Sequence, residues 1–266
     1  MINSVPYLAA LMFSAFCIPL SVDADTRIPA AIARALLDPR RPPEQVKLDP
    51  ARKPAELMAF AEIKRGARVA DFMPGNAYFT RLMSDVVGAR GHVYAFLPTE
   101  QLANCSPEEV AGTKALEHDP AYANVSILRG STANFRVPEK LDIIWTAQNY
   151  HDLHDSFMGP ADVAALNKRF FDALTPGGVF LVIDHVAETG SGLRDTESRH
   201  RIDPLRLRQE IEAAGFVLDA KSDALSNPKD DHKLSVFDPS VRGQTDQVVY
   251  RFRKPQRGGV SWHEIC

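Results

Sequence analysis

Two polar segments of the sequence hold residues suited to acid–base chemistry, and each follows an apolar run of strand length. Gln148-Asn149-Tyr150-His151-Asp152-Leu153 follows residues 141–146, and Asp184-His185 follows residues 179–183. An imidazole with an unperturbed pKa of about 6.5 can take up a proton near neutral pH, so His151 is a candidate general base. Asp152, Asp184 and His185 are its candidate catalytic neighbours. A structural role for His151, capping its loop through hydrogen bonds, remains an alternative.

Metal ligation is a second alternative for the same region. If the two preceding strands are neighbours in a sheet, six side chains converge there: His151, Asp152, His154, Asp184, His185 and His200. These ligand types could bind a divalent metal ion, orient a substrate or form a network of hydrogen-bonded loops. No spacing typical of a zinc site is present, so the sequence alone assigns no metal ligand.

A third segment, Asp71-Phe72-Met73-Pro74-Gly75-Asn76-Ala77-Tyr78-Phe79-Thr80, joins a short apolar run to an amphipathic one. Apolar residues recur after it at helical spacing: Phe79, Leu82, Met83, Val86 and Val87. The pattern predicts a strand at 68–73, a tight turn and a helix. An acidic residue followed by a glycine turn at such a junction is how doubly wound α/β domains bind nucleoside ligands.

The elements that must position these segments alternate along the chain. Strands are predicted at 68–73, 92–96, 125–128, 141–146, 179–183, near Val217 and at 247–252, and helices at 54–63, 163–174 and 205–214. Alternation of this kind predicts an α/β fold with a mostly parallel sheet covered on both faces. The run 247–252 alternates and has polar flanks, which favours a place at the edge of the sheet.

Four local motifs, in order along the chain, connect this pattern to a known family. They are Val69-Ala70-Asp71 with Gly75 and Thr80; Leu174-Thr175-Pro176-Gly177-Gly178; Ala213-Ala214-Gly215-Phe216; and Tyr250-Arg251-Phe252-Arg253-Lys254-Pro255. Together they resemble the motifs of class I S-adenosylmethionine-dependent methyltransferases, over residues 54–255. The chain also looks like a bacterial branch of predicted methyltransferases that carries export signals and the blocks Gln-Asn-Tyr-His-Asp and Asp-His.

The resemblance implies a fold, a cofactor and a reaction. The fold is a doubly wound, mostly parallel seven-stranded sheet with its last strand antiparallel, and the cofactor is S-adenosylmethionine. The implied cofactor-binding residues are Asp71, Met73, Pro74, Gly75, Asn76, Tyr78, Glu100, Thr146 and Gln148. His151 falls where plant-type O-methyltransferases have the His of a His-Asp-Trp block, which removes a proton from the acceptor hydroxyl. The implied reaction is methyl transfer to an oxygen or nitrogen of a small molecule.

Two features depart from the family pattern. Only Gly75 remains in a loop that often holds two or three glycines, and Asn76 beside it is a residue that tolerates positive φ. Phe96 stands where the acidic residue that binds the cofactor ribose is expected, and Glu100 is the nearest carboxylate. Loss of a bidentate charged acceptor could cost on the order of 2–3 kcal/mol of binding. A non-methylating protein that binds another ligand or a metal on the same fold is therefore the alternative function.

Composition limits the function classes. The chain has 266 residues, 45% hydrophobic and 24% charged, which suits one soluble α/β domain with an N-terminal extension. A net charge of -3 and scattered basic residues argue against nucleic acid as a partner and leave a small-molecule substrate. Cys105 and Cys266 could pair in an oxidising compartment or stay independent, whereas Cys17 lies in the N-terminal apolar run.

The N-terminus resembles an export signal. Residues 5–20 are apolar except for Ser14, a run shorter than the ~20 residues of a membrane span, and Val22-Asp23-Ala24 offers a small-residue cleavage site. We expect a signal peptide at 1–24, an N-terminal arm at 25–53, a methyltransferase-like domain at 54–256 and a tail at 257–266. The mature protein would be periplasmic or secreted, without a stable membrane span. If uncleaved, the segment would be a membrane anchor, and a buried helix is the third possibility.

Overall fold

The structure, a computed structural model, describes residues 28–159 and 161–256. The expected signal peptide, the C-terminal tail, Cys17 and Cys266 lie outside these residues. Cys105 is a free, half-buried thiol. Among the residues described, no helix has the length and apolar character needed to cross a bilayer.

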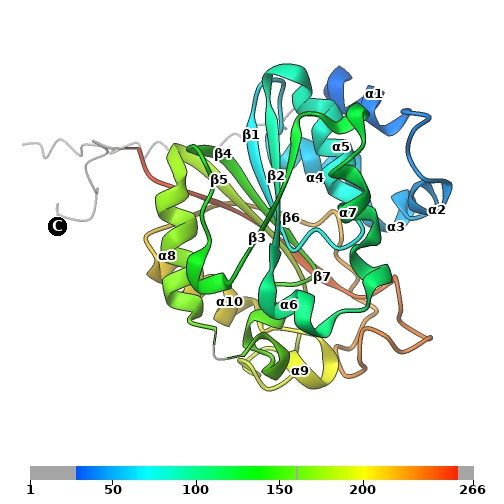
Figure 1. Ribbon diagram of the computed structural model, residues 1–266. Coiled ribbons are helices and arrows are strands. Elements are labelled where there is room, and N and C mark those ends of the chain that lie inside the picture. Colours follow the sequence, from blue (N-terminus) through cyan, green and yellow to red (C-terminus); the bar gives the residue numbers. More distant parts are fainter. Residues whose placement is uncertain (1–27, 160, 257–266) are drawn as a thin grey trace, which may run out of the picture.

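A seven-stranded sheet forms the centre of the fold (Figure 1). Its strands are β1 (Arg68–Phe72), β2 (His92–Pro98), β3 (Val125–Gly130), β4 (Leu141–Ala147), β5 (Leu174–His185), β6 (Val217–Ser222) and β7 (Gln247–Arg253). They follow the order β3-β2-β1-β4-β5-β7-β6, and β7 alone runs antiparallel to both its neighbours. The predicted doubly wound sheet is confirmed, and its strand order reverses between β1 and β4, where ligands bind in such folds.

Helices cover both faces of the sheet through two apolar clusters. On one face, α1 (Ala30–Leu36), α4 (Pro54–Phe60) and α5 (Tyr78–Val87) pack on β1, β4 and β5. On the other face, α8 (Val163–Ala173) and α10 (Pro204–Ala213) pack on an aromatic cluster that includes Phe72, Phe96 and Phe180. The helical spacing after Asp71 is confirmed, since Leu82, Met83 and the valines of α5 are all buried.

Shorter elements connect the strands and the longer helices. The helices are α2 (Pro43–Val46), α3 (Asp49–Arg52), α6 (Thr99–Asn104), α7 (Ala111–Leu116) and α9 (Thr196–Arg199). Single 3-10 turns are η1 (Gly88–Arg90), η2 (Pro107–Val110), η3 (Pro120–Tyr122), η4 (Thr132–Asn134), η5 (His151–His154) and η6 (Ser156–Met158). The expected N-terminal arm packs on the domain, with Ile32 and Ala35 of α1 buried in the cluster under α5.

The prediction of an edge position for residues 247–252 is wrong. β7 lies between β5 and β6, and the exposed edges of the sheet are β3 and β6. The polar residues of β7 have partners inside the fold: Gln247 accepts a hydrogen bond from Gln148, and Arg251 pairs with Asp219 and Glu62. Alternation of apolar and polar residues shows which face of the sheet each side chain points to. It does not show whether the strand lies at the edge or in the interior of the sheet.

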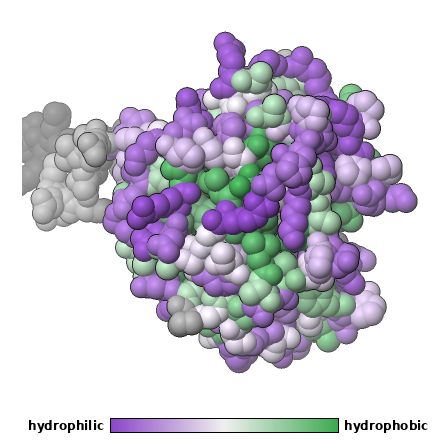
Figure 2. Space-filling view, in the orientation of Figure 1, coloured by the Kyte–Doolittle hydropathy of each residue, from purple (hydrophilic) through white to green (hydrophobic). Residues whose placement is uncertain are grey.

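The two exposed edges differ in character. β6 alternates between exposed and half-buried residues, as a solvated edge does. Along β3 the apolar residues are only half-buried, and Figure 2 shows a narrow apolar band crossing an otherwise hydrophilic face where β3 lies in Figure 1. Arg129, paired with Glu117, is the exposed charged residue of β3.

Candidate functional site

A first cavity of about 630 Å³ lies beyond the carboxyl ends of β1 and β4, a size typical of small-molecule sites. Seven of the nine residues assigned to cofactor binding from the sequence line it: Asp71, Met73, Pro74, Gly75, Asn76, Tyr78 and Gln148. Its other walls include Pro42, Gln45, Leu48 and Arg52 of the N-terminal arm, together with Arg81 and Asn149. The arm thus forms part of the site, which the sequence did not indicate.

The turn between β1 and α5 uses three left-handed residues. Met73, Gly75 and Ala77 have φ values of 58°, 54° and 61°, whereas Asn76, the residue expected to accept positive φ, does not. Asn76 instead fixes the turn through hydrogen bonds: its Oδ1 accepts from the Gly112 N–H at 2.8 Å, and its carbonyl accepts from Gln45 at 2.8 Å. A single glycine suffices because these contacts hold the non-glycine residues in a strained conformation.

Asp71 ends β1 at the floor of the first cavity. Its side chain is buried, and the Thr80 hydroxyl donates a hydrogen bond to its Oδ2 at 2.6 Å. Burial raises the pKa of the Asp71 carboxyl to about 7, and the Thr80 hydrogen bond opposes that rise. The group that a cationic ligand would meet here is therefore close to half ionised at neutral pH.

Two residues assigned to cofactor binding lie outside the lining of this cavity. Glu100 accepts hydrogen bonds from the Thr132 N–H and hydroxyl at 2.9 and 3.0 Å, and the Thr146 hydroxyl donates to Asn149. Gln101, the neighbour of Glu100, lines the cavity in its place.

Phe96 is also placed differently from the prediction. Its ring stacks on Phe72 with centroids 5.8 Å apart, on the sheet face covered by α8. Asp71 pairs with Ala95 in the sheet, and because side chains alternate along a strand, Ala95 and Leu97 are the residues of β2 on the Asp71 face. The end of β2 therefore offers an apolar side chain on either face.

Cationic side chains supplement Asp71 in the first cavity. Arg52 of α3 lies over the Tyr78 ring, with its guanidinium carbon 4.6 Å from the ring centroid. The Tyr78 hydroxyl in turn donates to Asp49 at 2.6 Å, and Asp49 forms an ion pair with Arg41. This linkage ties the arm to α5 and places one guanidinium at the cavity wall.

A second cavity, of about 530 Å³, adjoins the first. Gln101, Gln148 and Asp152 line both cavities, and His151, His185 and His200 line the second. The convergence expected from the sequence is therefore observed for five of the six side chains. His154 is the exception, because it turns toward α10 and pairs with Glu210 at 3.0 Å.

His151 is held by a buried carboxylate. Asp184 lies at 0% exposure, with Oδ1 2.7 Å from His151 Nδ1 and Oδ2 accepting the His151 backbone N–H at 2.7 Å. Burial lowers the pKa of the imidazole, but the carboxylates of Asp184 and Asp152 outweigh burial and raise the pKa to about 10. At neutral pH the free side chain is thus an imidazolium, whereas the sequence argument assumed an unperturbed pKa.

His185 has the opposite character. Its ring is buried, Nδ1 lies 2.8 Å from the Thr245 hydroxyl, and burial lowers its pKa to about 4. His185 is therefore a neutral hydrogen-bonding group at the wall of the second cavity. Environment thus gives opposite pKa shifts to the two histidines that the sequence placed among the candidate catalytic residues.

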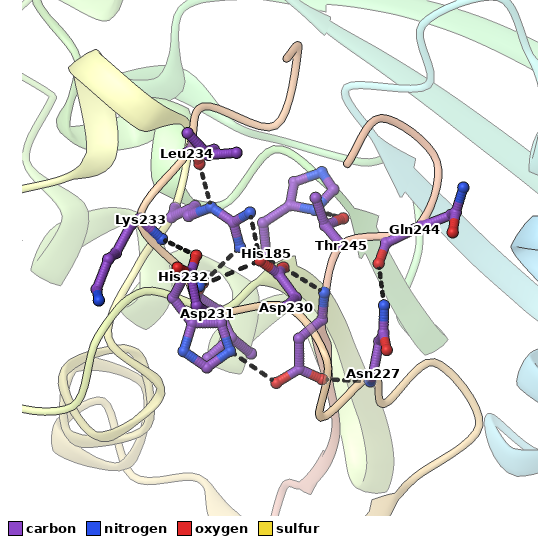
Figure 3. A network of polar contacts seen from close by, with 12 residues as sticks. His185, Asn227, Asp230, Asp231, His232, Lys233, Leu234, Gln244 and Thr245 are labelled. Atoms are coloured by element: carbon purple, nitrogen blue, oxygen red, sulfur yellow. Dashed lines mark hydrogen bonds and ion pairs between the residues drawn. The ribbon is translucent and has the colours of Figure 1, made fainter. Parts of the chain in front are cut away.

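The segment between β6 and β7 closes the second cavity through Val236 and Phe237. A buried ion pair anchors this segment: Arg201, fully buried, binds both oxygens of Asp230 at 2.8 and 3.1 Å. Arg201 Nε also donates to the Leu234 carbonyl at 2.8 Å. Figure 3 shows the network around Asp230, in which Thr245 lies beside His185. The exposed Phe237 ring reaches His200, with centroids 4.7 Å apart.

Asp155, which the sequence argument did not single out, completes the polar cluster. It follows η5 and is 1% exposed, and neither of its carboxylate oxygens has a hydrogen-bond partner among the described residues. Burial raises the pKa of this carboxyl. The nearby Thr196 hydroxyl opposes this rise in the pKa of Asp155. Its proton, however, is donated to the Leu193 carbonyl and is not available to the carboxylate. Only burial reveals this residue, because an Asp after a short turn looks like a solvated loop residue.

The fold of this chain is shared by solved structures. The amino-acid sequence matches no protein-family model and no curated protein. A methyltransferase from Aquifex aeolicus dependent on S-adenosylmethionine superposes with a TM-score of 0.54 at 17% identity, covering 80% of this chain and 98% of that one. The corresponding enzyme from Mesorhizobium loti gives 0.53 at 16%, covering 77% and 99%.

A third similar structure differs in its chemistry. The (4+2)-cyclase SpnF superposes with a TM-score of 0.54 at 17% identity, covering 82% of this chain and 84% of that chain. Identities this low establish architecture, and the chemistry has to be argued from the site. The sheet order, the antiparallel β7 and these superpositions together show that the chain has the fold of class I S-adenosylmethionine-dependent methyltransferases.

Proposed function

We propose that the protein binds S-adenosylmethionine in the first cavity and transfers its methyl group to a small molecule in the second. The observation that carries the proposal is the pair of adjoining cavities at the carboxyl ends of β1, β4 and β5, which share Gln148 and Asp152. In this fold those ends are where ligands bind. A methyl donor in the first cavity and a methyl acceptor in the second would meet beside Gln148 and Asp152.

The charges of the first cavity suit this cofactor. S-adenosylmethionine carries a sulfonium, an ammonium and a carboxylate, so it needs both an anion and a cation from the protein. Asp71 supplies a buried carboxylate, and Arg52 supplies a guanidinium that also lines the cavity. Gly75 leaves open space, with the nearest atom 4.0 Å from where a side chain would begin. For Glu100 to bind the ribose, as the sequence implies, it would have to leave Thr132.

The acceptor would be an oxygen or nitrogen nucleophile beside His151. Asp184 holds Nδ1, which directs Nε2 toward Asp152 and His200 at the second cavity. His151 can serve as general base only when Nε2 carries no proton, and the two carboxylates favour the protonated form. The unprotonated form of His151, whose share rises with pH, would therefore take the proton of the acceptor on Nε2, with Asp152, Asp184 and His185 as supporting groups.

Calorimetric titration of S-adenosylmethionine into the purified chain tests the proposal. We expect micromolar binding, weakened by Asp71→Asn and by Arg52→Gln. A matched control is Asp172→Asn, because Asp172 is an exposed carboxylate on α8, away from both cavities, that pairs with Lys168. Absence of heat at millimolar ligand, or equal affinities in all three variants, would contradict cofactor binding at this site.

A non-methylating protein on the same fold is the second candidate, and the match to the cyclase SpnF favours it. If the non-methylating protein binds another ligand, the titration above finds no heat; if it binds the cofactor, a second measurement separates the two candidates. Incubation with radiolabelled cofactor and a set of phenols, catechols and amines would show label transfer for a methyltransferase. Cofactor binding without transfer to any of them would support the alternative.

We also propose that residues 1–24 direct export of the chain, from the apolar run and the cleavage site described above. Residues 1–35 fused to a phosphatase that is active only outside the cytoplasm should give activity. A matched fusion with Leu11→Arg and Phe13→Arg should lose it, because charge disrupts the apolar run. Equal activity of the two fusions would reject the signal.

A further inference from the structure

Four side chains beside the second cavity bring ligand atoms to one point. They are His151, Asp152, Asp155 and His200, and one ligand atom from each lies within 4.8 Å of the other three. Three of the four come from one short segment, η5 and the residue after it, and His200 follows α9. Contact between α9 and η5 therefore assembles the cluster from residues almost fifty positions apart.

The spacing of these atoms fits a bound cation. His151 Nε2 lies 3.0 Å from Asp152 Oδ1 and 3.3 Å from His200 Nδ1, and the last two atoms are 3.7 Å apart. In a tetrahedral site with metal–ligand bonds of about 2.0–2.2 Å, neighbouring ligand atoms lie about 3.3–3.6 Å apart. The triangle formed by the three atoms is close to one face of such a tetrahedron.

Asp155 provides an independent indication. Asp155 is only 1% exposed, and one of its carboxylate oxygens belongs to the cluster. Neither oxygen has a hydrogen-bond donor among the described residues. Buried carboxylates without partners are costly, and a coordinated cation removes that cost. Thr196 does not fill this role, because its hydroxyl donates to Leu193.

Asp184 supplies the outer support that metal-binding histidines usually have. It engages His151 Nδ1 at 2.7 Å, so Nε2 is the atom turned toward the cluster. A carboxylate behind a ligating imidazole fixes its ring and tautomer and strengthens it as a ligand. Asp184 is itself fixed by the backbone N–H groups of His151 and His185.

We propose that His151, Asp152, Asp155 and His200 form a binding site for a first-row divalent cation of the zinc type. Two imidazoles and two carboxylates suit Zn²⁺, Co²⁺ or Fe²⁺ better than the all-oxygen preference of Mg²⁺ or Ca²⁺. The two ligand carboxylates balance the charge of the ion. Because His151, Asp152 and His200 also line the second cavity, the bound ion faces the space where an oxygen or nitrogen ligand could join it.

A cation bound here occupies His151 Nε2, so His151 is a ligand in the cation-bound chain and a general base only in the cation-free chain. The test of the cation site needs no activity. The full chain, stripped with a chelator and dialysed, is titrated with Zn²⁺ in competition with a chromophoric chelator. We expect one equivalent to bind. Asp155→Asn and His200→Gln should each weaken binding by on the order of tenfold or more, and Asp184→Asn by about 10–100-fold through the outer support. Mg²⁺ should not compete.

The control is His232→Gln. His232 also pairs with a carboxylate, Asp246 at 3.1 Å, but it lies outside the cluster, so its loss should leave Zn²⁺ binding unchanged. Visible absorption of the Co²⁺ form should show the intense bands of tetrahedral coordination and should lose them in Asp155→Asn. Circular dichroism establishes that each variant is folded.

Two results would overturn the site. One is the absence of stoichiometric Zn²⁺ binding by the folded, full-length chain. The other is Zn²⁺ binding of equal strength in Asp155→Asn, His200→Gln and the His232→Gln control, which would place the ion elsewhere.

Discussion

The carboxyl of Asp71 makes a quantitative prediction about stability. In the folded chain it is buried with one hydrogen bond, and burial raises its pKa from 3.8 to about 7. A difference of this size corresponds to about 4 kcal/mol between the two protonation states. We therefore expect the wild-type chain to be less stable at alkaline pH than a variant with a neutral residue here.

The direction follows from proton linkage. Below about pH 4 Asp71 is protonated in both the folded and the unfolded chain, so its burial has no ionisation cost. Between pH 4 and 7 the folded chain holds a proton that the unfolded chain has released, and the free energy of unfolding falls as pH rises. Above pH 7 both forms are ionised, and the destabilisation stays constant.

Asp71→Asn removes this pH dependence. Its amide oxygen can still accept the Thr80 hydroxyl, and its shape matches that of the carboxyl. Urea unfolding of the two proteins from pH 4.5 to 8.5 should give similar free energies at the acidic end. At pH 8 the variant should be more stable by up to about 4 kcal/mol. Asp172→Asn, exposed on α8, should give a small difference across the same range.

Two outcomes would refute the reasoning. Parallel curves for wild type and Asp71→Asn would mean that the carboxyl titrates normally and is solvated. A variant less stable at pH 8 would mean that a cation we have not identified pairs with Asp71 in the folded chain.

Three further predictions concern the site and its supports. Affinity for S-adenosylmethionine should rise as pH increases toward 7 and level off above it, because the cationic ligand favours ionised Asp71; calorimetry from pH 5.5 to 8.5 should find this trend absent in Asp71→Asn. Asp230→Asn should lower the free energy of unfolding by about 3–5 kcal/mol in urea titration, since it leaves the charge of Arg201 buried and uncompensated; a loss below about 1 kcal/mol would show that water reaches the pair. Gly75→Ala should cost about 1–2 kcal/mol in thermal unfolding, since a Cβ has space there but φ is 54°, and an unchanged midpoint would mean that the turn adopts another conformation.

Local signals were sufficient to predict most of the sheet. Apolar runs between turn residues located the strands, and the helical spacing after Asp71 located α5. They did not reveal where β7 inserts, because strand order is set by contacts between residues far apart in the sequence. The polar residues of β7 suggested an edge, yet Arg251 reaches across to Asp219 on β6.

The candidate site was predictable in part. Residues on the β1 turn and after β4 could be assigned because strand ends of a parallel sheet share one edge. Arg52 could not be assigned to the first cavity from the sequence, because its position there depends on how the N-terminal arm folds back over Tyr78. Asp155 and the pKa of His151 depend on burial and on distances of a few ångströms, which residue types and spacing do not encode.

The insertion of β7 between β5 and β6 has a consequence for synthesis of the chain on the ribosome. β5 ends at His185, but its neighbour β7 is made roughly 70 residues later, a delay of several seconds at ~5–20 residues per second. During this interval the emerging chain exposes an open, apolar sheet edge, and β6 has no strand to join. β7, the last strand of the described chain to be made, thus joins β6 to the rest of the sheet, and we expect chaperones that shield strand edges to act on this chain between the appearance of β5 and that of β7.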